Sequence, residues 1–143
     1  PKTLEFNCRM GDPETEVVMP RLKSDLLSLL LAAGNGTLND CTVSLDPRSA
    51  TTVVAVSGGY PEAYEKGFPI TGTESIGSDA LLFHMGTVDQ NGVLKTQGGR
   101  VLAVTTYGHT IAEAVQQAQT ELGKIQFEGK YHRRDIGFEF PDA

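Results

Sequence analysis

Beyond residue 50, short β-branched runs alternate with glycine turns, and this pattern restricts the possible folds most strongly. Residues 51–57, 80–87 and 100–106 each have the length and the side-chain types of a strand. An Asn91-Gly92 pair follows the second run and has apolar residues on both sides, which is a strong signal for a two-residue hairpin. We therefore predict a largely antiparallel sheet for this part of the chain.

One long helix is predicted after the last of these strands. Thr110 and Glu113 have the T-x-x-E spacing of a capping box, in which each residue satisfies a backbone N–H at the helix start. Apolar residues then recur at helical spacing, at Ile111, Ala114, Val115, Ala118, Leu122 and Ile125. Strands, a hairpin and a helix in this order indicate an α+β fold.

The first fifty residues have a different organisation. Residues 3–9 predict a strand, and the Gly11-Asp12-Pro13 turn ends it. We predict a short helix over residues 14–19, a kink or restart at Pro20, and a second helix that ends at Gly34. Residues 35–49 are polar and mark the crossing into a second unit, so we divide the chain into residues 1–38 and 39–143.

Composition limits the partners of the chain. The net charge of −6 and the isoelectric point near 5.0 argue against non-specific binding of nucleic acid or of anionic membranes. No apolar run has the length of a membrane span. Cys8 and Cys41 lack the spacing of a metal site or a CxxC motif, which favours a reducing, cytoplasmic setting.

Glu5, Asn7 and Arg9 recur at every second residue of the first predicted strand, so their side chains are expected on one face. Carboxylate and amide oxygens suit Mg²⁺, which commonly takes one or two protein ligands and completes its shell with water and phosphate. A cation beside the metal suits a developing negative charge. The alternative is an exposed strand with alternating polar residues. Cys8 is expected on the opposite, packed face.

Arg100, Lys130, Arg133 and Arg134 form a second group of candidates. Arginine forks make paired hydrogen bonds to phosphate oxygens, so these cations suit a phosphorylated ligand. Gly98 and Gly99, just before Arg100, would let backbone N–H groups approach an anion. The alternative is a solvated basic tail on an acidic protein.

Two further features favour structural roles. The Ser57-Gly58-Gly59 segment lacks the Lys-Ser/Thr of a phosphate-binding P-loop, so we predict a structural turn. His84 lies within an apolar run and is predicted to be a hydrogen-bonded histidine of the sheet or core.

Five blocks of the chain, in the same order, resemble the C-terminal part of the phosphoribosylamine–glycine ligases (glycinamide ribonucleotide synthetases), ATP-grasp enzymes of purine biosynthesis. They span nearly the whole length and are more specific than any single motif. The blocks are LEFNCRMGDPETEVVMPRLKSDL at 4–26, SGGYPEAYEKGFPITG at 57–72, LFHMGT at 82–87, GGRVLAVT at 98–105 and FEGKYHRRDIGF at 127–138.

The resemblance implies that residues 1–38 are the last strand and helices of an ATP-grasp domain. Residues 39–143 would then be a small, mostly antiparallel β-rich domain with one long helix, which closes over the substrate. It also implies the reaction, in which ATP, glycine and 5-phosphoribosylamine give glycinamide ribonucleotide, ADP and phosphate through a glycyl phosphate. The implied partners are these small molecules and the rest of the ATP-grasp chain.

The resemblance assigns roles to several residues. Glu5 and Asn7 match the E-x-N metal pair of the family, for Mg²⁺ or Mn²⁺, and Arg9 matches the arginine that follows it and holds the carboxylate or acyl phosphate. Arg133 and Arg134 lie in the family's RRDIG block, where Arg134 replaces the usual lysine, and the resemblance implies that these arginines and Arg100 hold the ribose 5-phosphate. The residues that clamp the nucleotide have no counterpart here, so we expect the chain alone to be inactive. A stand-alone binding or assembly module is the competing interpretation.

Overall fold

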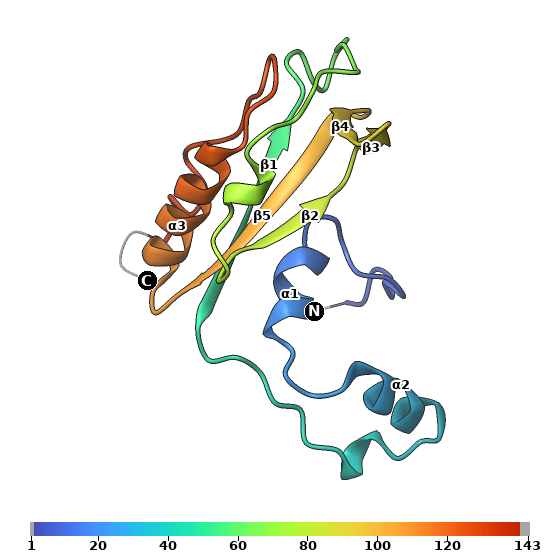
Figure 1. Cartoon of the computed structure of the whole chain (residues 1–143). Helices are drawn as coiled ribbons and strands as arrows, with labels where there is room; N and C mark the ends of the chain where they lie inside the picture. The colour runs from blue at the N-terminus through green and yellow to red at the C-terminus, as the bar shows by residue number, and fades with distance from the viewer. Residues whose placement is uncertain (1, 141–143) are drawn as a thin grey trace. The chain divides into compact units, whose positions relative to one another are not determined.

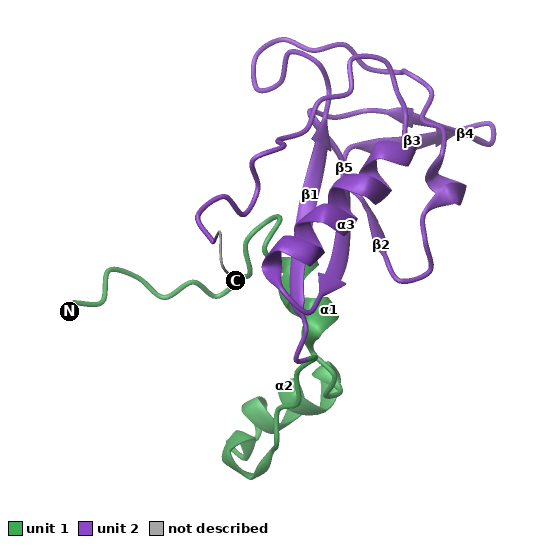
Figure 2. Cartoon of the chain, turned by 90° about the vertical axis from the view of Figure 1, so that its left-hand side faces the viewer, with its two compact units in different colours: residues 1–46 green, residues 47–143 purple. Residues whose placement is uncertain are grey.

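The computed structural model describes residues 2–140 and divides the chain into two compact units. The first unit ends at Asp46 and the second begins at Pro47 (Figure 2). The division falls later than the boundary predicted after residue 38, which lies instead within the 3₁₀ turn Leu38–Asp40 of the first unit.

The second unit contains the predicted antiparallel sheet (Figure 1). Strands β1 (Ser49–Val56) and β2 (Leu81–His84) pair with opposite edges of the central strand β5 (Arg100–Gly108). Strands β3 (Thr87–Gln90) and β4 (Val93–Thr96) form a separate two-stranded sheet. The α+β fold class and the antiparallel pairing are confirmed.

The run predicted as one strand over residues 80–87 is divided into two. Strand β2 ends at His84, and the N–H groups of Met85 and Gly86 both donate to the carbonyl oxygen of Val101, at 3.0 and 3.2 Å. This shared acceptor interrupts the regular ladder, and the chain enters β3 as part of a different sheet. Continuous β propensity did not reveal this break because it arises from contacts with β5.

The predicted hairpin turn is confirmed. Asn91 and Gly92 have positive φ angles of 56° and 80°, as a two-residue turn of the I′ type requires. The Gly92 N–H donates to Asp89 Oδ1 at 2.9 Å, which fixes the turn from within. The strands on either side pair in register from Thr87 with Thr96 to Gln90 with Val93.

Helix α3 (Ile111–Lys124) begins at the predicted capping box. Thr110 Oγ1 accepts the N–H of Glu113 at 3.1 Å, and Glu113 Oε2 accepts the N–H of His109 at 2.8 Å. In the usual capping box, the glutamate accepts the N–H of the cap residue itself. Here Glu113 accepts the N–H of His109, the residue before the cap. The predicted apolar face is confirmed, since Ala114, Ala118 and Leu122 of the helix are fully buried.

This helix packs on the sheet and forms the core of the second unit. Figure 2 shows α3 lying along β1 and β5. The largest fully buried apolar side chains come from these elements and from the residues just after the helix, namely Val53, Val101, Leu102, Val104, Leu122 and Ile125. The core thus fixes the start of the C-terminal tail against the sheet.

The first unit contains two helices, α1 (Thr15–Arg21) and α2 (Leu26–Gly34). Helix α1 continues through Pro20 instead of restarting there, and ends one residue later. The two helices are separated by an extended turn in which Asp25 caps α2 by accepting the N–H of Ser28 at 2.7 Å. No residue from 2 to 45 is buried.

The predicted strand over residues 3–9 is wrong for the structure of this chain. Residues 2–8 have no regular structure and no strand partner among the described residues. Leu4 and Phe6, which would face the core if the strand were part of a sheet, are 97% and 92% exposed. A strand needs a neighbour to accept its hydrogen bonds, and the described part of the chain supplies none.

Within residues 2–140, none of the helices is both long enough and apolar enough to pass through a bilayer.

Candidate functional site

The N-terminal hollow, lined by Asn7, Cys8, Arg9, Met10, Gly11 and Glu14, contains part of the predicted metal site. Its volume is about 560 Å³. Arg9 Nη1 donates to the carbonyl oxygen of Met10 at 3.2 Å, and Glu14 Oε2 accepts the N–H of Gly11 at 2.9 Å. The carboxylate of Glu14 therefore closes the turn before α1, which is a structural role.

The structure brings together only some of the predicted N-terminal residues. Asn7 and Arg9 line the N-terminal hollow, whereas Glu5 does not. Among residues 2–140 there is no cluster of three or more His, Cys, Asp and Glu side chains that would hold a metal ion by themselves. Cys8 is exposed, so its predicted packed position is wrong because the sheet that would cover it is not formed.

The C-terminal tail lines a second, larger depression, here called the basic hollow. Its volume is about 830 Å³. Its lining comes from six successive tail residues, from the last turn of α3 and from the segment just after it: Lys130, Tyr131, His132, Arg133, Arg134, Asp135, Gly123 and Gln126. Two of the predicted substrate-binding residues, Arg133 and Arg134, are thus brought together with His132, which sequence reasoning passed over.

Lys130 is held by the C-terminal end of α3. Its Nζ donates to the carbonyl oxygen of Leu122 at 3.0 Å and to that of Ile125. A lysine at this position satisfies helix carbonyls that have no partner within the helix and complements the negative end of the dipole. Burial lowers the pKa of the Lys130 ammonium group. Its first role is therefore to fasten the tail to the helix.

Arg133 already has a partner in the tail, the carboxylate of Asp135. Its Nε and Nη2 donate to the two carboxylate oxygens of Asp135, both at 2.9 Å, in an exposed bidentate pair. The hydrogen bonds raise the pKa of Arg133 and lower the pKa of Asp135. The carbonyl oxygen of Arg133 accepts Gln119 Nε2 at 2.8 Å, which ties this part of the tail to α3.

His132 and Arg134 are differently placed. Within residues 2–140, neither side chain makes a hydrogen bond or an ion pair. His132 is half-buried, and its desolvation, together with the charges of Lys130 and Arg134, lowers the pKa of its imidazole. The clue in the sequence was the position of His132 inside a run of cations, because such a run concentrates charge in one place.

Arg100 lies beside the basic hollow without lining it. Its partner in β1 is Val56, and Val56 exchanges two backbone hydrogen bonds with Tyr131, at 2.8 and 3.0 Å. Arg100 and Tyr131 therefore occupy one row across the sheet, two strand spacings or about 10 Å apart. This register brings residues 100 and 131 to the same part of the second unit.

The backbones of Gly98 and Gly99 are packed against neighbouring segments. The Gly98 N–H donates to the carbonyl oxygen of Gly86 at 3.1 Å, and Ser57 donates to the carbonyl oxygens of both glycines. A Cβ on Gly99 would lie 2.0 Å from the ring of Tyr60. These contacts give Gly98 and Gly99 a structural role in close packing. Their binding of an anion stays a prediction.

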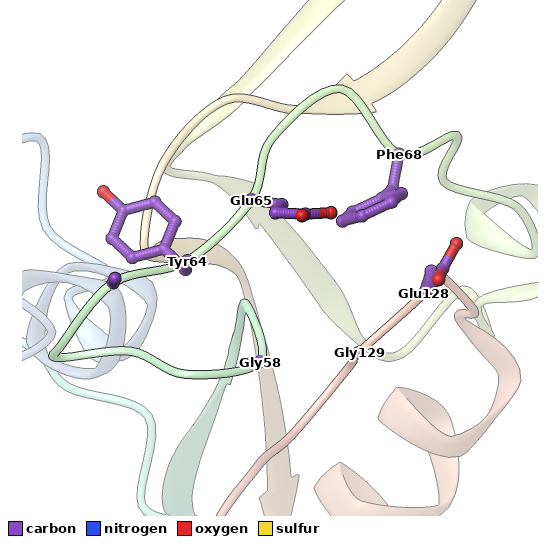
Figure 3. A pocket seen from close by; sticks show the side chains of 7 residues that line it. Gly58, Tyr64, Glu65, Phe68, Glu128 and Gly129 are labelled. Atoms are coloured by element: carbon purple, nitrogen blue, oxygen red, sulfur yellow. The ribbon is translucent and has the colours of Figure 1, made fainter.

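A third hollow has the opposite electrostatic character (Figure 3). Tyr64 and Phe68 contribute aromatic rings, Glu65 and Glu128 contribute carboxylates, and the volume is about 450 Å³. Its floor includes Gly58, where a Cβ would lie 2.8 Å from the carbonyl oxygen of Gly129. The predicted structural role of the Gly58 turn is consistent with this close packing, and two carboxylates make the hollow unsuitable for a phosphate.

His84 does not belong to the core. Its side chain is exposed, and Nδ1 lies 3.0 Å from Thr87 Oγ1. The prediction of a hydrogen-bonded histidine of the sheet or core is confirmed for the sheet, because His84 is the last residue of β2 and has this partner. It is exposed because β2 is an edge strand, where one face of an apolar run can remain open to solvent.

Comparisons with known proteins identify the family of this chain. The family model described as phosphoribosylglycinamide synthetase, C domain, matches residues 50–139. The chain belongs to this family. The matched range lies within the second unit and includes the whole basic hollow, but it excludes Glu5, Asn7 and Arg9.

Relatives in this family also match the first unit. A bifunctional purine biosynthetic protein of Pichia angusta is 49% identical over 138 residues, which cover 95% of this chain and 17% of that protein. A phosphoribosylamine–glycine ligase of Vibrio parahaemolyticus is 43% identical over 139 residues, covering 96% and 32%. The chain therefore spans about a third, or less, of the length of these relatives.

A solved structure supports the fold. The crystal structure of phosphoribosylamine–glycine ligase from Thermotoga maritima is 36% identical and superimposes with a TM-score of 0.69. The match covers 92% of this chain and 32% of that one.

Proposed function

We propose that this chain is part of an ATP-dependent ligase that joins glycine to 5-phosphoribosylamine in purine biosynthesis. The products are glycinamide ribonucleotide, ADP and phosphate, and the reaction proceeds through a glycyl phosphate. One observation carries the proposal: proteins named phosphoribosylamine–glycine ligase are 42–46% identical to this chain over 95–96% of its length. The basic hollow adds a site of the correct charge for a phosphorylated sugar.

The metal proposal concerns Glu5 and Asn7. Their carboxylate and amide oxygens are the hard donors that Mg²⁺ or Mn²⁺ takes, and two protein ligands leave the rest of the shell for water and nucleotide phosphate. A bound divalent ion would neutralise phosphate charge during phosphoryl transfer. Arg9, which lines the N-terminal hollow beside Asn7, would hold the glycine carboxylate or the acyl phosphate through its guanidinium group.

The substrate proposal concerns the basic hollow and the residues beside it. Arg133 and Arg134 of the hollow, Arg100, and the Gly98-Gly99 pair just before Arg100 remain the predicted contacts of the ribose phosphate. The proposed partners are ATP, glycine, 5-phosphoribosylamine and the rest of an ATP-grasp chain, with no nucleic acid and no membrane. The proposed location is the cytoplasm.

The proposal is tested with the intact protein that carries this segment. Purified protein supplied with ATP, glycine, freshly formed 5-phosphoribosylamine and Mg²⁺ is expected to release ADP and glycinamide ribonucleotide in equal amounts. The 143-residue chain alone is expected to release neither, because the nucleotide-binding residues of the family lie outside the part that it matches. Product formation by the short chain, or none by the intact protein, would contradict the proposal.

The metal ligands need their own measurement. In the intact protein, Glu5→Gln and Asn7→Ala are expected to lower kcat and to raise the Mg²⁺ concentration needed for half-maximal rate. Glu62→Gln removes a carboxylate from an exposed loop of the second unit and is the matched control. An unchanged Mg²⁺ requirement in the first two variants would show that the ligands lie elsewhere.

A further inference from the structure

We propose that His132 and Arg134 are the groups of the basic hollow that receive the substrate's phosphate, and that His132 takes up a proton when the phosphate binds. The inference rests on the proposed function for the identity of the ligand. It goes beyond that function because it assigns a role to His132 and selects between the two adjacent arginines.

The hydrogen bonds within the hollow support this selection. Lys130 already donates to two carbonyl oxygens at the end of α3, and Arg133 already forms a bidentate pair with Asp135. A ligand that recruited either cation would first have to replace these bonds. Arg134 and His132 have no such bonds among residues 2–140, so they can donate to a phosphate without first giving up a hydrogen bond within the protein.

The charge of the hollow is complementary to a phosphate monoester. Three fixed positive charges (Lys130, Arg133 and Arg134) and one negative charge (Asp135) leave a balance of +2 when His132 is neutral. A phosphate monoester carries about −1.5 to −2 near neutral pH. This local balance stands out on a chain whose net charge is −6.

The groups around His132 determine how it responds to an anion. The charges that act on its imidazole are those of Lys130 and Arg134, while the end of α3 contributes only uncharged lining residues. The nearest charged residues of the helix end, Glu121 and Lys124, are paired with each other at 2.8 Å. The remaining titratable and charged groups of the hollow are Tyr131, Arg133 and Asp135.

Binding and protonation are therefore coupled. In the free protein, desolvation and the two neighbouring cations lower the pKa of His132, so the imidazole is neutral at neutral pH. A bound dianion adds an opposite charge beside the ring and raises that pKa. Between the free and the bound pKa values, binding takes up a proton, and affinity for the dianion falls as pH rises through the bound value.

The experiment uses the 143-residue chain and follows the imidazole C–H signals of its three histidines by NMR as pH is varied between about 5 and 8. Sulfate is the first probe, because it stays divalent across this range and cannot itself titrate. Ribose 5-phosphate is the second. Both are expected to raise the pKa of His132 by about one unit, which corresponds to about tenfold tighter binding to the protonated form.

His84 and His109 are internal controls, since both are exposed and neither lines the hollow. Their C–H signals are expected not to respond to either probe. An equal shift in all three histidines, or no shift in His132 when the probe binds, would overturn the proposed proton uptake.

Variants separate the contributions of the cations. Arg134→Ala is expected to weaken ribose 5-phosphate binding about tenfold, since a charge-assisted hydrogen bond is lost. His132→Gln is expected to abolish the pH dependence of sulfate binding while leaving binding at high pH close to that of the parent chain. Lys66→Ala, which removes a cation placed over Tyr64 outside the hollow, is the matched control and is expected to have no effect.

The outcomes distinguish this inference from the proposed function. If the intact protein forms glycinamide ribonucleotide but Arg134→Ala binds ribose 5-phosphate as tightly as the parent chain, the inference fails and the function stands. If the probes bind with the expected proton uptake but the intact protein forms no product, the hollow is an anion site and the proposed function fails.

Discussion

The two units of this chain use their apolar residues in opposite ways. In the second unit, apolar side chains of β1, β5 and α3 are buried against one another and form a continuous core. In the first unit, four of the five leucines of α2 are exposed, and Leu27, Leu30 and Leu31 each have more than half of their surface open to solvent. One unit has an interior of its own, and the other has none.

Backbone hydrogen bonds, instead of a core, hold the first unit together. The N–H groups of Lys23 and Ser24 both donate to the carbonyl oxygen of Ser44, and the N–H of Asp46 donates to that of Arg21 at 2.7 Å. Helix α2 has nine residues, and helices of this length are marginal in water unless an apolar face is packed. Contiguous exposed leucines are typical of an interaction surface. The stability of the described chain therefore comes mainly from the second unit.

The largest expected difference in stability between the two units comes from replacing one leucine by alanine in α3 and one in α2. Leu122→Ala in α3 removes a fully buried side chain and is expected to lower the free energy of unfolding by about 2–5 kcal/mol. Leu30→Ala in α2, where the side chain is 60% exposed, is expected to change it by less than about 0.5 kcal/mol. Urea titrations followed by circular dichroism measure both. Equal losses would show that the first unit has a core of its own.

A smaller difference in unfolding free energy is expected when one glycine of each unit is replaced by alanine. A Cβ on Gly86 would lie 2.5 Å from the carbonyl oxygen of Arg100 and 2.6 Å from the Cα of Gly98, and these are backbone atoms that cannot turn aside. Gly86→Ala is therefore expected to cost about 1–3 kcal/mol of unfolding free energy. Gly34→Ala, at the end of α2, meets nothing within 4 Å and is the control, with no loss expected. A stable Gly86→Ala variant would mean that β2 and β5 can separate at this point.

Local sequence signals predicted the second unit well. The Asn91-Gly92 hairpin and the Thr110 capping box depend on a few adjacent residues, and each formed as expected. The helix face that contains Leu122 was predicted from its spacing alone and is buried. Local backbone preference, turn chemistry and burial agree here, which is why sequence reasoning succeeded.

The failures share a physical cause, which is that the deciding contact was distant in the sequence. The strand over residues 3–9 required a partner that the described chain does not contain, and the break between β2 and β3 arises from hydrogen bonds with β5. In the candidate site, the positions of Arg133 and Arg134 in one hollow followed from their adjacency. The capture of Lys130 by the end of α3 did not, because it depends on how the tail folds back.

The smallest expected effect on stability comes from the N-cap residues of two helices, Thr110 before α3 and Asp25 before α2. Thr110→Ala removes the side-chain acceptor of the Glu113 N–H and is expected to cost about 1 kcal/mol of unfolding free energy, because α3 forms part of the core. Asp25→Ala removes the equivalent acceptor of α2, whose fraying disrupts no buried contact, so the unfolding midpoint is expected to stay where it is. Hydrogen exchange should instead show faster exchange confined to the first turn of α2. If Asp25→Ala shifts the unfolding midpoint as much as Thr110→Ala does, the two units unfold together. The difference between the units would then be one of side-chain packing and not of stability.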